Sequence, residues 1–100
     1  MESKNHQRGV QLFELGRYNE AVSYLQQAIT ESVYNYGSKY YLALCFFNME
    51  AYDKSETILN ELLHETPNEG NLFFLKGQIA SRKDKSAEAL QFVNQSIELD

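Results

Sequence analysis

Few residues of this chain have the types and spacing that metal binding requires. Glu61 and His64, in the stretch ELLHE, form a Glu-x-x-His pair, which di-metal helical bundles supply twice. This chain contains the pair once, and its other histidine, His6, lies far away in the sequence. Because a metal ion requires several converging ligands, we expect no metal site and no cofactor.

The residues that could act as nucleophiles or bind phosphate give no stronger indication of an enzyme. Cys45 lies in the apolar stretch YLALCFFN without a nearby histidine to activate it, so we expect a small buried thiol. The basic cluster SRKDKS, residues 81–86, is interpreted as a solvated turn. The sequence contains no glycine-rich phosphate loop, nucleophile elbow or pair of catalytic carboxylates, and it predicts no enzyme.

The composition predicts one small folded domain in the cytoplasm. The chain has 100 residues, of which 43% are hydrophobic, and a net charge of -5, which disfavours nucleic acid as a partner. The longest apolar run, residues 40–47, is too short to span a membrane, and the first nine residues show no secretion signal. A single cysteine suits a reducing compartment.

The elements that position these residues follow a period of 34 residues. Small and apolar residues recur at this interval through three units: Gly9, Ala43 and Gly77; Ala21, Ser55 and Ala89; Leu25, Leu59 and Val93; Ile29, Leu63 and Ile97; and, in two units, Tyr18 and Tyr52. A fixed period of this length is typical of repeat proteins. We therefore expect three similar structural units.

Each unit is predicted to contain two amphipathic helices and no strand. The first helices are expected to end near Leu15, Met49 and Arg82, and the second helices to open after the motifs GRYN, EAYD and DKSA. Asn19 is a candidate N-cap, and Asp53 with Glu56 forms a capping-box pattern. The stretch TPNEG, residues 66–70, is predicted to break the chain between the second and third units.

Small residues at helical spacing predict a closely packed hairpin. Gly9, Ala21 and Ala28 would allow two helices to approach, while larger neighbours such as Leu25 fill the space around them. Gly16 lies at the turn, where a residue without Cβ adopts positive φ readily, and Tyr18 is expected to pack over the corner.

These residues resemble the tetratricopeptide repeat over essentially the whole chain. The resemblance rests on Gly9, Leu12, Gly16, Tyr18, Ala21 and Ala28 in the first copy, on Leu42, Ala43, Phe46, Tyr52, Leu59 and Pro67 in the second, and on Gly77, Ala89 and the closing SIELD in the third. It implies an all-α fold, a right-handed superhelix of three antiparallel hairpins, in one domain of residues 1–100. The repeats would span approximately 2–35, 36–69 and 70–100.

Several positions depart from the pattern of the family. They are Val33 at a proline position, Glu50 and Asp84 at turn glycines, Ser55 and Ser96 at packing alanines, and Ser86 at the corner tyrosine. These departures predict somewhat looser hairpins. The third copy also stops before its expected proline and lacks a solvating helix, so we expect a piece of a longer array or a last helix that another molecule covers.

The resemblance implies a concave groove that binds a peptide or a helix. The family's groove positions carry His6, Gln7, Val10, Phe13, Tyr40, Tyr41, Leu44, Phe47, Asn48, Phe74, Leu75, Gln78 and Arg82. We expect Tyr40, Tyr41 and Phe74 to be exposed there, whereas Leu44 and Leu75 are equally compatible with core packing. Family members that bind chaperone carboxylates use a Lys/Asn/Lys/Arg clamp, and this chain lacks its cations.

The sequence therefore predicts a protein–protein interaction scaffold with an apolar and aromatic groove, and it disfavours a chaperone tail as ligand. Two alternatives stay open. One is an RNA binder of the pentatricopeptide kind, although the groove positions are aromatic rather than basic. The other is self-association as a homodimer through the last helix, at Leu90, Val93 and Ile97.

Overall fold

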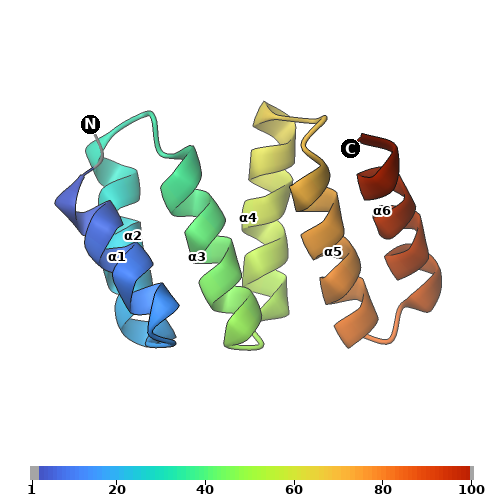
Figure 1. Ribbon diagram of the computed structural model, residues 1–100, viewed down its shortest axis with the longest axis horizontal. Helices are drawn as coiled ribbons and strands as arrows, with labels where there is room; N and C mark the ends of the chain where they lie inside the picture. Colours follow the sequence, from blue (N-terminus) through green and yellow to red (C-terminus); the bar gives the residue numbers. More distant parts are fainter. Residues whose placement is uncertain (1–2, 100) are drawn as a thin grey trace. The chain divides into compact units, whose positions relative to one another are not determined.

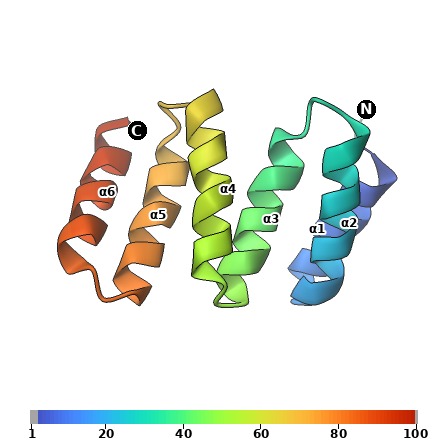
Figure 2. The same ribbon diagram turned by 180° about the vertical axis from the view of Figure 1, so that it is seen from behind.

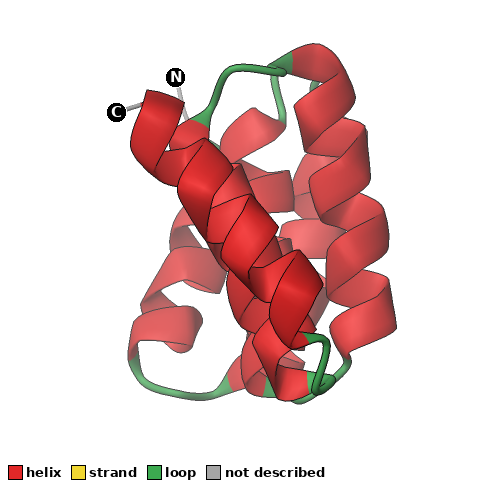
Figure 3. Ribbon diagram, turned by 90° about the vertical axis from the view of Figure 1, so that its right-hand side faces the viewer, coloured by secondary structure: helices red, strands yellow, loops and turns green. Residues whose placement is uncertain are grey.

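The regular secondary structure of the described residues, 3–99 of a computed structural model, is entirely α-helical (Figures 1 and 3). The helices are α1 (Lys4–Glu14), α2 (Tyr18–Glu31), α3 (Tyr36–Asn48), α4 (Tyr52–Glu65), α5 (Gly70–Arg82) and α6 (Ser86–Leu99). The predicted all-α fold is confirmed. By its internal contacts the chain divides into two compact units, unit 1 up to Ile58 and unit 2 from Leu59 onward.

Within each unit, consecutive helices pack against one another. In unit 1, α2 contacts both α1 and α3, and the view from behind shows α2 beside α3 (Figure 2). In unit 2, α5 packs against α6 (Figure 1). The linker between α4 and α5 covers residues 66–69, which agrees with the predicted break at TPNEG.

The turn after the first helix of each hairpin has the same backbone geometry. Gly16 has a φ of 76°, and the residues at the same position of the other hairpins, Glu50 and Asp84, have φ of 62° and 60°. In all three turns this residue donates its N–H to the carbonyl three residues earlier, and the next residue donates to the carbonyl five residues earlier, at 2.8–3.1 Å. This is a Schellman motif, and the predicted positive φ of Gly16 is confirmed.

The second helices begin earlier than predicted, and both N-cap predictions are wrong. The Schellman turn needs so few residues that α2 already starts at Tyr18, which places Asn19 inside its first turn. The cap position belongs to Arg17, whose guanidinium pairs with the Glu20 carboxylate at 2.7 Å. In the same way α4 starts at Tyr52, so Asp53 lies within the helix, where the helix dipole favours its charge.

The core of unit 1 depends on a close approach of α1 and α2. A Cβ atom at Gly9 would lie 2.6 Å from Cγ of Leu25, closer than van der Waals contact permits. Leu25 is fully buried and belongs to a cluster that includes Leu42 and Cys45 of α3. The predicted role of Gly9 as a close-approach residue is confirmed.

Aromatic pairs cover the corners of two hairpins. The rings of Phe13 and Tyr18 lie 5.7 Å apart, and those of Phe47 and Tyr52 lie 5.7 Å apart in the next hairpin. This confirms the prediction that Tyr18 packs over the corner. The third hairpin has the exposed serines Ser81 and Ser86 at the corresponding positions, and so lacks this aromatic cover.

One of the polar departures from the repeat pattern is a structural link. Ser55 is fully buried, and its Oγ donates a hydrogen bond of 2.8 Å to the carbonyl oxygen of Ala43. The bond ties α4 to α3 within unit 1. A buried hydroxyl with such a partner avoids the desolvation penalty of an unpaired one.

Unit 2 repeats the close approach between its own helices. A Cβ at Gly77 of α5 would lie 3.0 Å from Val93 of α6. Lys76 connects three elements, because its Nζ donates to Oδ1 of Asn60 at 2.7 Å and lies 4.8 Å from the ring centre of Phe92. Such a cation–π contact adds modest stability at a partly exposed site.

The only cysteine in the sequence, Cys45, lies in the core of unit 1. It is fully buried, as predicted, and desolvation by burial raises the pKa of its thiol from 9.0 to about 11. The thiolate is the reactive form, so the native protein holds this sulfur in an unreactive state at neutral pH.

Substituting Gly9→Leu is expected to destabilise the protein by about 1 to 3 kcal/mol, because the added side chain collides with Leu25. Urea denaturation measures the loss. Gly37→Ala is the control, since a Cβ there first meets His6 at 3.4 Å, and it should cause no comparable loss. Equal midpoints for the Gly9 variant and the parent chain would contradict the proposed packing.

Substituting Glu50→Gly is expected to stabilise the protein by about 0.5 to 1 kcal/mol. Relief of the left-handed strain exceeds the entropy that glycine adds to the unfolded chain. Its neighbour in the same turn, Met49, has a φ of -86°, so Met49→Gly should instead destabilise. Thermal denaturation of both variants provides the comparison, and a loss of stability in both would refute the strain argument.

The Cys45 thiol is expected to react with a disulfide reagent at about pH 8 at least about 100-fold more slowly in the folded than in the urea-unfolded chain. Because the folded pKa is raised, the neutral thiol contributes stability that is complete below pH 9.0 and lost as the pH rises to about 11. The stability difference between the parent chain and Cys45→Ala should shrink over that interval. A constant difference would show that the pKa is not raised.

Candidate functional site

Unit 1 contains most of the predicted groove residues, on α1 and α3. Half-buried side chains follow one face of α1 at His6, Val10 and Phe13, with spacings of four and three residues. From α3 come the half-buried Tyr40, Tyr41, Leu44 and Phe47 and the exposed Asn48. Because α1 and α3 are in contact, several of these residues meet.

Tyr41 lies at the centre of an aromatic cluster formed with His6, Phe13 and Tyr40. Its ring centroid lies 5.4 Å from that of Phe13, 6.0 Å from that of Tyr40 and 6.1 Å from that of His6. All three pairs have edge-to-face geometry, which aromatic quadrupoles favour. The four rings are half-buried, so they join α1 to α3 and still present surface to solvent.

A hollow of about 360 Å³ adjoins this aromatic cluster. Its described lining consists of His6, Gln7, Val10, Gln11 and Tyr41, and none of these residues is Lys, Arg, Asp or Glu. Four of the five are groove positions that the resemblance selects. Sequence reasoning missed Gln11, although its spacing of four residues from Gln7 places both amides on one side of α1.

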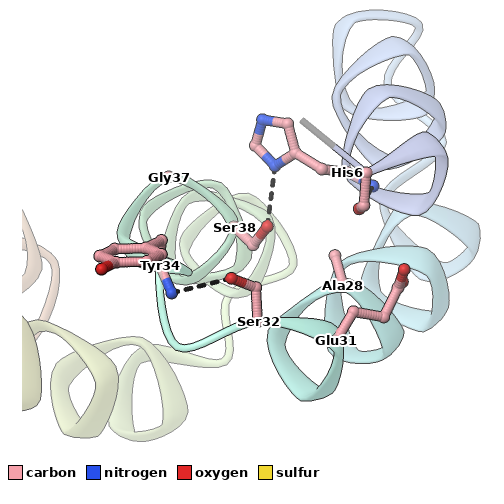
Figure 4. A pocket seen from close by; sticks show the side chains of 8 residues that line it. His6, Ala28, Glu31, Ser32, Tyr34, Gly37 and Ser38 are labelled. Atoms are coloured by element: carbon pink, nitrogen blue, oxygen red, sulfur yellow. Dashed lines mark hydrogen bonds between the residues drawn. The ribbon is translucent and has the colours of Figure 1, made fainter. Parts of the chain in front are cut away.

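A second hollow, of about 590 Å³, lies beside the loop between α2 and α3 (Figure 4). Its described lining is more polar and consists of Ser3, His6, Ala28, Glu31, Ser32, Tyr34, Gly37 and Ser38. His6 projects from α1 toward Ser38, and its Nδ1 lies 2.8 Å from the buried Ser38 Oγ (Figure 4). The sequence showed no motif for this hollow, because the α2–α3 loop creates it.

The loop beside the second hollow is held by short-range hydrogen bonds. The amide of Asn35 donates to the carbonyl oxygens of Ile29 and Ser32 at 3.1 and 3.0 Å. The backbone N–H of Tyr34 donates to Ser32 Oγ at 3.0 Å, and the Tyr34 side chain is 94% exposed. The loop therefore presents an aromatic ring from an anchored backbone.

Two predicted groove residues on α3 have other contacts. Phe47 packs against Tyr52 at the hairpin corner, with a centroid distance of 5.7 Å. The side-chain amide of Asn48 donates to the carbonyl oxygen of Leu44 at 2.8 Å, within its own helix. These contacts give both residues a local structural role.

The remaining groove positions lie on α5 in unit 2. Phe74, Gln78 and Arg82 are exposed and share one side of the helix through spacings of four residues, and the Phe74 side chain is 44% exposed. Leu75, for which core and groove were equally compatible, is buried in the core.

Metal-binding and membrane-spanning features were searched in the described range. Among residues 3–99, no three His, Cys, Asp or Glu side chains lie together in a way that could hold a metal ion. Within the same range, no helix combines the length and apolarity needed to cross a bilayer.

Solved structures match the fold closely, although no curated protein matches the chain in sequence. The crystal structure of SycD, a type III secretion translocator chaperone of Yersinia enterocolitica, has a TM-score of 0.88 at 20% identity, over 96% of this chain and 73% of that chain. MamA of Desulfovibrio magneticus RS-1 has a TM-score of 0.85 at 17% identity, over 96% and 54%. This chain thus spans about half of the MamA chain.

A third similar structure is the second TPR of Spaghetti (RPAP3), solved bound to an HSP90 peptide. Its TM-score is 0.85 at 19% identity, over 96% of this chain and 89% of that chain. Likenesses at these identities show the fold alone.

Sequence comparison with families agrees with the helical hairpins. A family model described as tetratricopeptide repeat matches residues 12–79, and a second with the same description matches residues 70–100. Several structural features lie at positions that carry the resemblance. They are the Schellman turn at Gly16, the corner rings of Tyr18 and Tyr52 and the close approach at Gly9. This chain belongs to the tetratricopeptide repeat family.

Proposed function

We propose that this protein is a non-catalytic module that binds a peptide or a helical segment of another protein. The proposed site is the aromatic cluster of unit 1 with the adjoining hollow of about 360 Å³. Protein partners are supported by the structural neighbours, since SycD is described as a chaperone and the RPAP3 domain was solved with an HSP90 peptide.

The observation that carries this proposal is the position of Tyr41, between three other rings and at the edge of a hollow. Edge-to-face contacts hold the ring in place before a ligand arrives, so binding loses little side-chain entropy. Tyrosine is also among the residues that most often dominate binding energy at interfaces. Tyr41 and Val10 would contact an apolar side chain of the ligand, while the amides of Gln7 and Gln11 would bind its backbone.

The chemistry of the lining disfavours anionic ligands. The positions that form a carboxylate clamp in some family members carry His6, Val10, Tyr41, Asn71 and Leu75 here. None of these is Lys or Arg, so a chaperone C-terminal carboxylate would find no salt-bridge partner at them. RNA phosphates would meet the same lack of cations in the lining of the hollow. An uncharged, apolar or aromatic segment is the ligand that we infer.

Three further features belong to the same proposal. The exposed face of α5 with Phe74, Gln78 and Arg82 is a binding surface of unit 2. A cytoplasmic location is supported by the single, unreactive thiol of Cys45. Two copies of the chain would self-associate through α6, which lies in unit 2. This association would not depend on the aromatic cluster of unit 1.

The proposal can be tested with a random peptide library displayed on phage, which is selected on the immobilised 100-residue chain. Enriched sequences are expected to share an aliphatic or aromatic residue flanked by uncharged residues. A synthetic peptide of that sequence then serves as the ligand for titration calorimetry. Enrichment of acidic C-terminal motifs, or no enrichment at all, would contradict the inferred ligand class.

Substituting Tyr41→Ala is expected to weaken binding of the selected peptide by about 1 to 3 kcal/mol, with helicity retained in circular dichroism. The matched control is Tyr24→Ala on α2, because the Tyr24 side chain is 37% exposed and lies outside the cluster. The control should bind like the parent chain. A Tyr41 variant that keeps its helicity and binds normally would show that the ring is not a ligand contact, and one that unfolds would show that the ring belongs to the core and that the groove is misplaced.

Substituting Phe74→Ala tests the surface of unit 2 in the same titration. We expect a loss of about 1 to 3 kcal/mol for peptides that contact α5 and little change in helicity, since the ring is 44% exposed. Unchanged affinity for every selected peptide would remove α5 from the binding surface and leave the proposal for unit 1 intact.

A further inference from the structure

The hollow beside the aromatic cluster contains two glutamine side chains whose amides are available to a ligand. Gln7 and Gln11 of α1 both line this hollow of about 360 Å³, and both are exposed. Within the described residues, 3–99, neither side chain forms a hydrogen bond to the protein. His6, which lines the same hollow, differs from them, because its Nδ1 already lies 2.8 Å from Ser38 Oγ.

A side-chain amide has the same hydrogen-bonding groups as a peptide unit. Its carbonyl oxygen accepts and its NH2 group donates. It can therefore pair with the N–H and the C=O of one ligand residue at the same time, as two residues do in a hydrogen-bonded pair of an antiparallel sheet. Because neither amide is charged, this pairing suits a hollow whose described lining contains no Lys, Arg, Asp or Glu.

The spacing of the two glutamines matches the repeat of an extended chain. Residues four apart in an α-helix are separated by about 6 Å along its axis, since each residue adds about 1.5 Å. An extended chain rises about 3.3 Å per residue and presents its N–H and C=O groups to the same side at every second residue, about 6.6 Å apart. Gln7 and Gln11 can therefore pair with alternate residues of a ligand that runs along α1.

A helical ligand offers these amides no comparable partners. Its backbone N–H and C=O groups are bonded to one another, except for four at each end. The glutamines would then meet only side chains, and an amide that loses water without gaining a partner costs free energy. The lining therefore favours a ligand whose backbone groups are not already paired.

An extended ligand also places its side chains where the rest of the lining can contact them. Successive side chains of an extended chain point to opposite faces. One set can therefore contact Val10 and Tyr41, which line the same hollow as the two amides, while the other set faces solvent. Both residues are half-buried, so they retain surface for these contacts.

We propose that unit 1 binds its ligand as an extended segment aligned with α1, in which Gln7 and Gln11 pair with the backbone of two residues that are two positions apart. This inference rests on the proposed function, because it specifies the conformation of the peptide that the same site binds. Apolar side chains at alternate positions of the segment contact Val10 and Tyr41. The glutamines thus fix the register of the segment, and the apolar contacts select its sequence.

Selection from two phage-displayed libraries on the immobilised 100-residue chain separates the two ligand conformations. One library displays random linear heptapeptides, which are too short to form a stable helix in water. The other displays random residues on one face of a stable helical peptide. We expect enrichment from the linear library only, with apolar residues at alternate positions instead of the spacing of three and four residues that a helical ligand requires.

The role of the amides is tested by titrating an enriched heptapeptide, synthesised, against variants of the chain. Gln7→Met and Gln11→Met keep the length of the side chain and remove the amide, so each is expected to weaken binding about 3- to 10-fold. Gln26→Met on α2 is the matched control, because Gln26 is also exposed and lies outside the described lining of the hollow. It should bind like the parent chain.

The backbone pairing is tested by placing single N-methyl groups along the heptapeptide. Each group removes one N–H donor, so we expect the largest losses at two positions that are two residues apart. The position that pairs with Gln11 should lose much less in the Gln11→Met variant than in the parent chain, because the two changes remove the same contact.

The outcomes distinguish this inference from the proposed function. Enrichment from the helical library, alone or with the linear one, would overturn the extended conformation and leave the proposed binding module intact. Enrichment from neither library would contradict the proposed function itself. If heptapeptides bind but every one binds both folded glutamine variants like the parent chain, or N-methylation weakens binding equally at all positions, the backbone pairing is overturned.

Discussion

The close contact of α1 with α2 is the constraint on which unit 1 depends. Only a hydrogen atom fits between the backbone at Gly9 and the side chain of Leu25. Leu25 also packs in the cluster with Leu42 and Cys45 of α3. The position of its side chain therefore determines how α3 packs against α2. A single contact inside one hairpin therefore positions the first helix of the next hairpin.

The candidate binding surface is what this packing leaves exposed. α1 and α3 both pack against α2, and they also contact each other. Where α1 and α3 meet, Tyr41 of α3 contacts Phe13 and His6 of α1. These rings are half-buried, so the same side chains join α1 to α3 and still present surface to solvent. The contacts with the neighbouring rings hold Tyr41 in edge-to-face positions.

The first and last helices of the described chain present different chemistry on their outer sides. On α1 the exposed Arg8 carries a charge, which favours contact with water. On α6 the exposed Leu90 and Ile97 are apolar.

The sequence by itself determined the features that depend on contacts within one hairpin. These are the close approach at Gly9, the positive φ of Gly16 and the corner packing of Tyr18, since each follows from a pattern inside one hairpin. The period of 34 residues is a property of the sequence itself. Only the tertiary structure decided that α2 starts before Asn19, that Leu75 belongs to the core, and that Gln11 and the anchored loop at Tyr34 line hollows. Exposure and concavity depend on how neighbouring helices pack, and a local pattern does not contain that information.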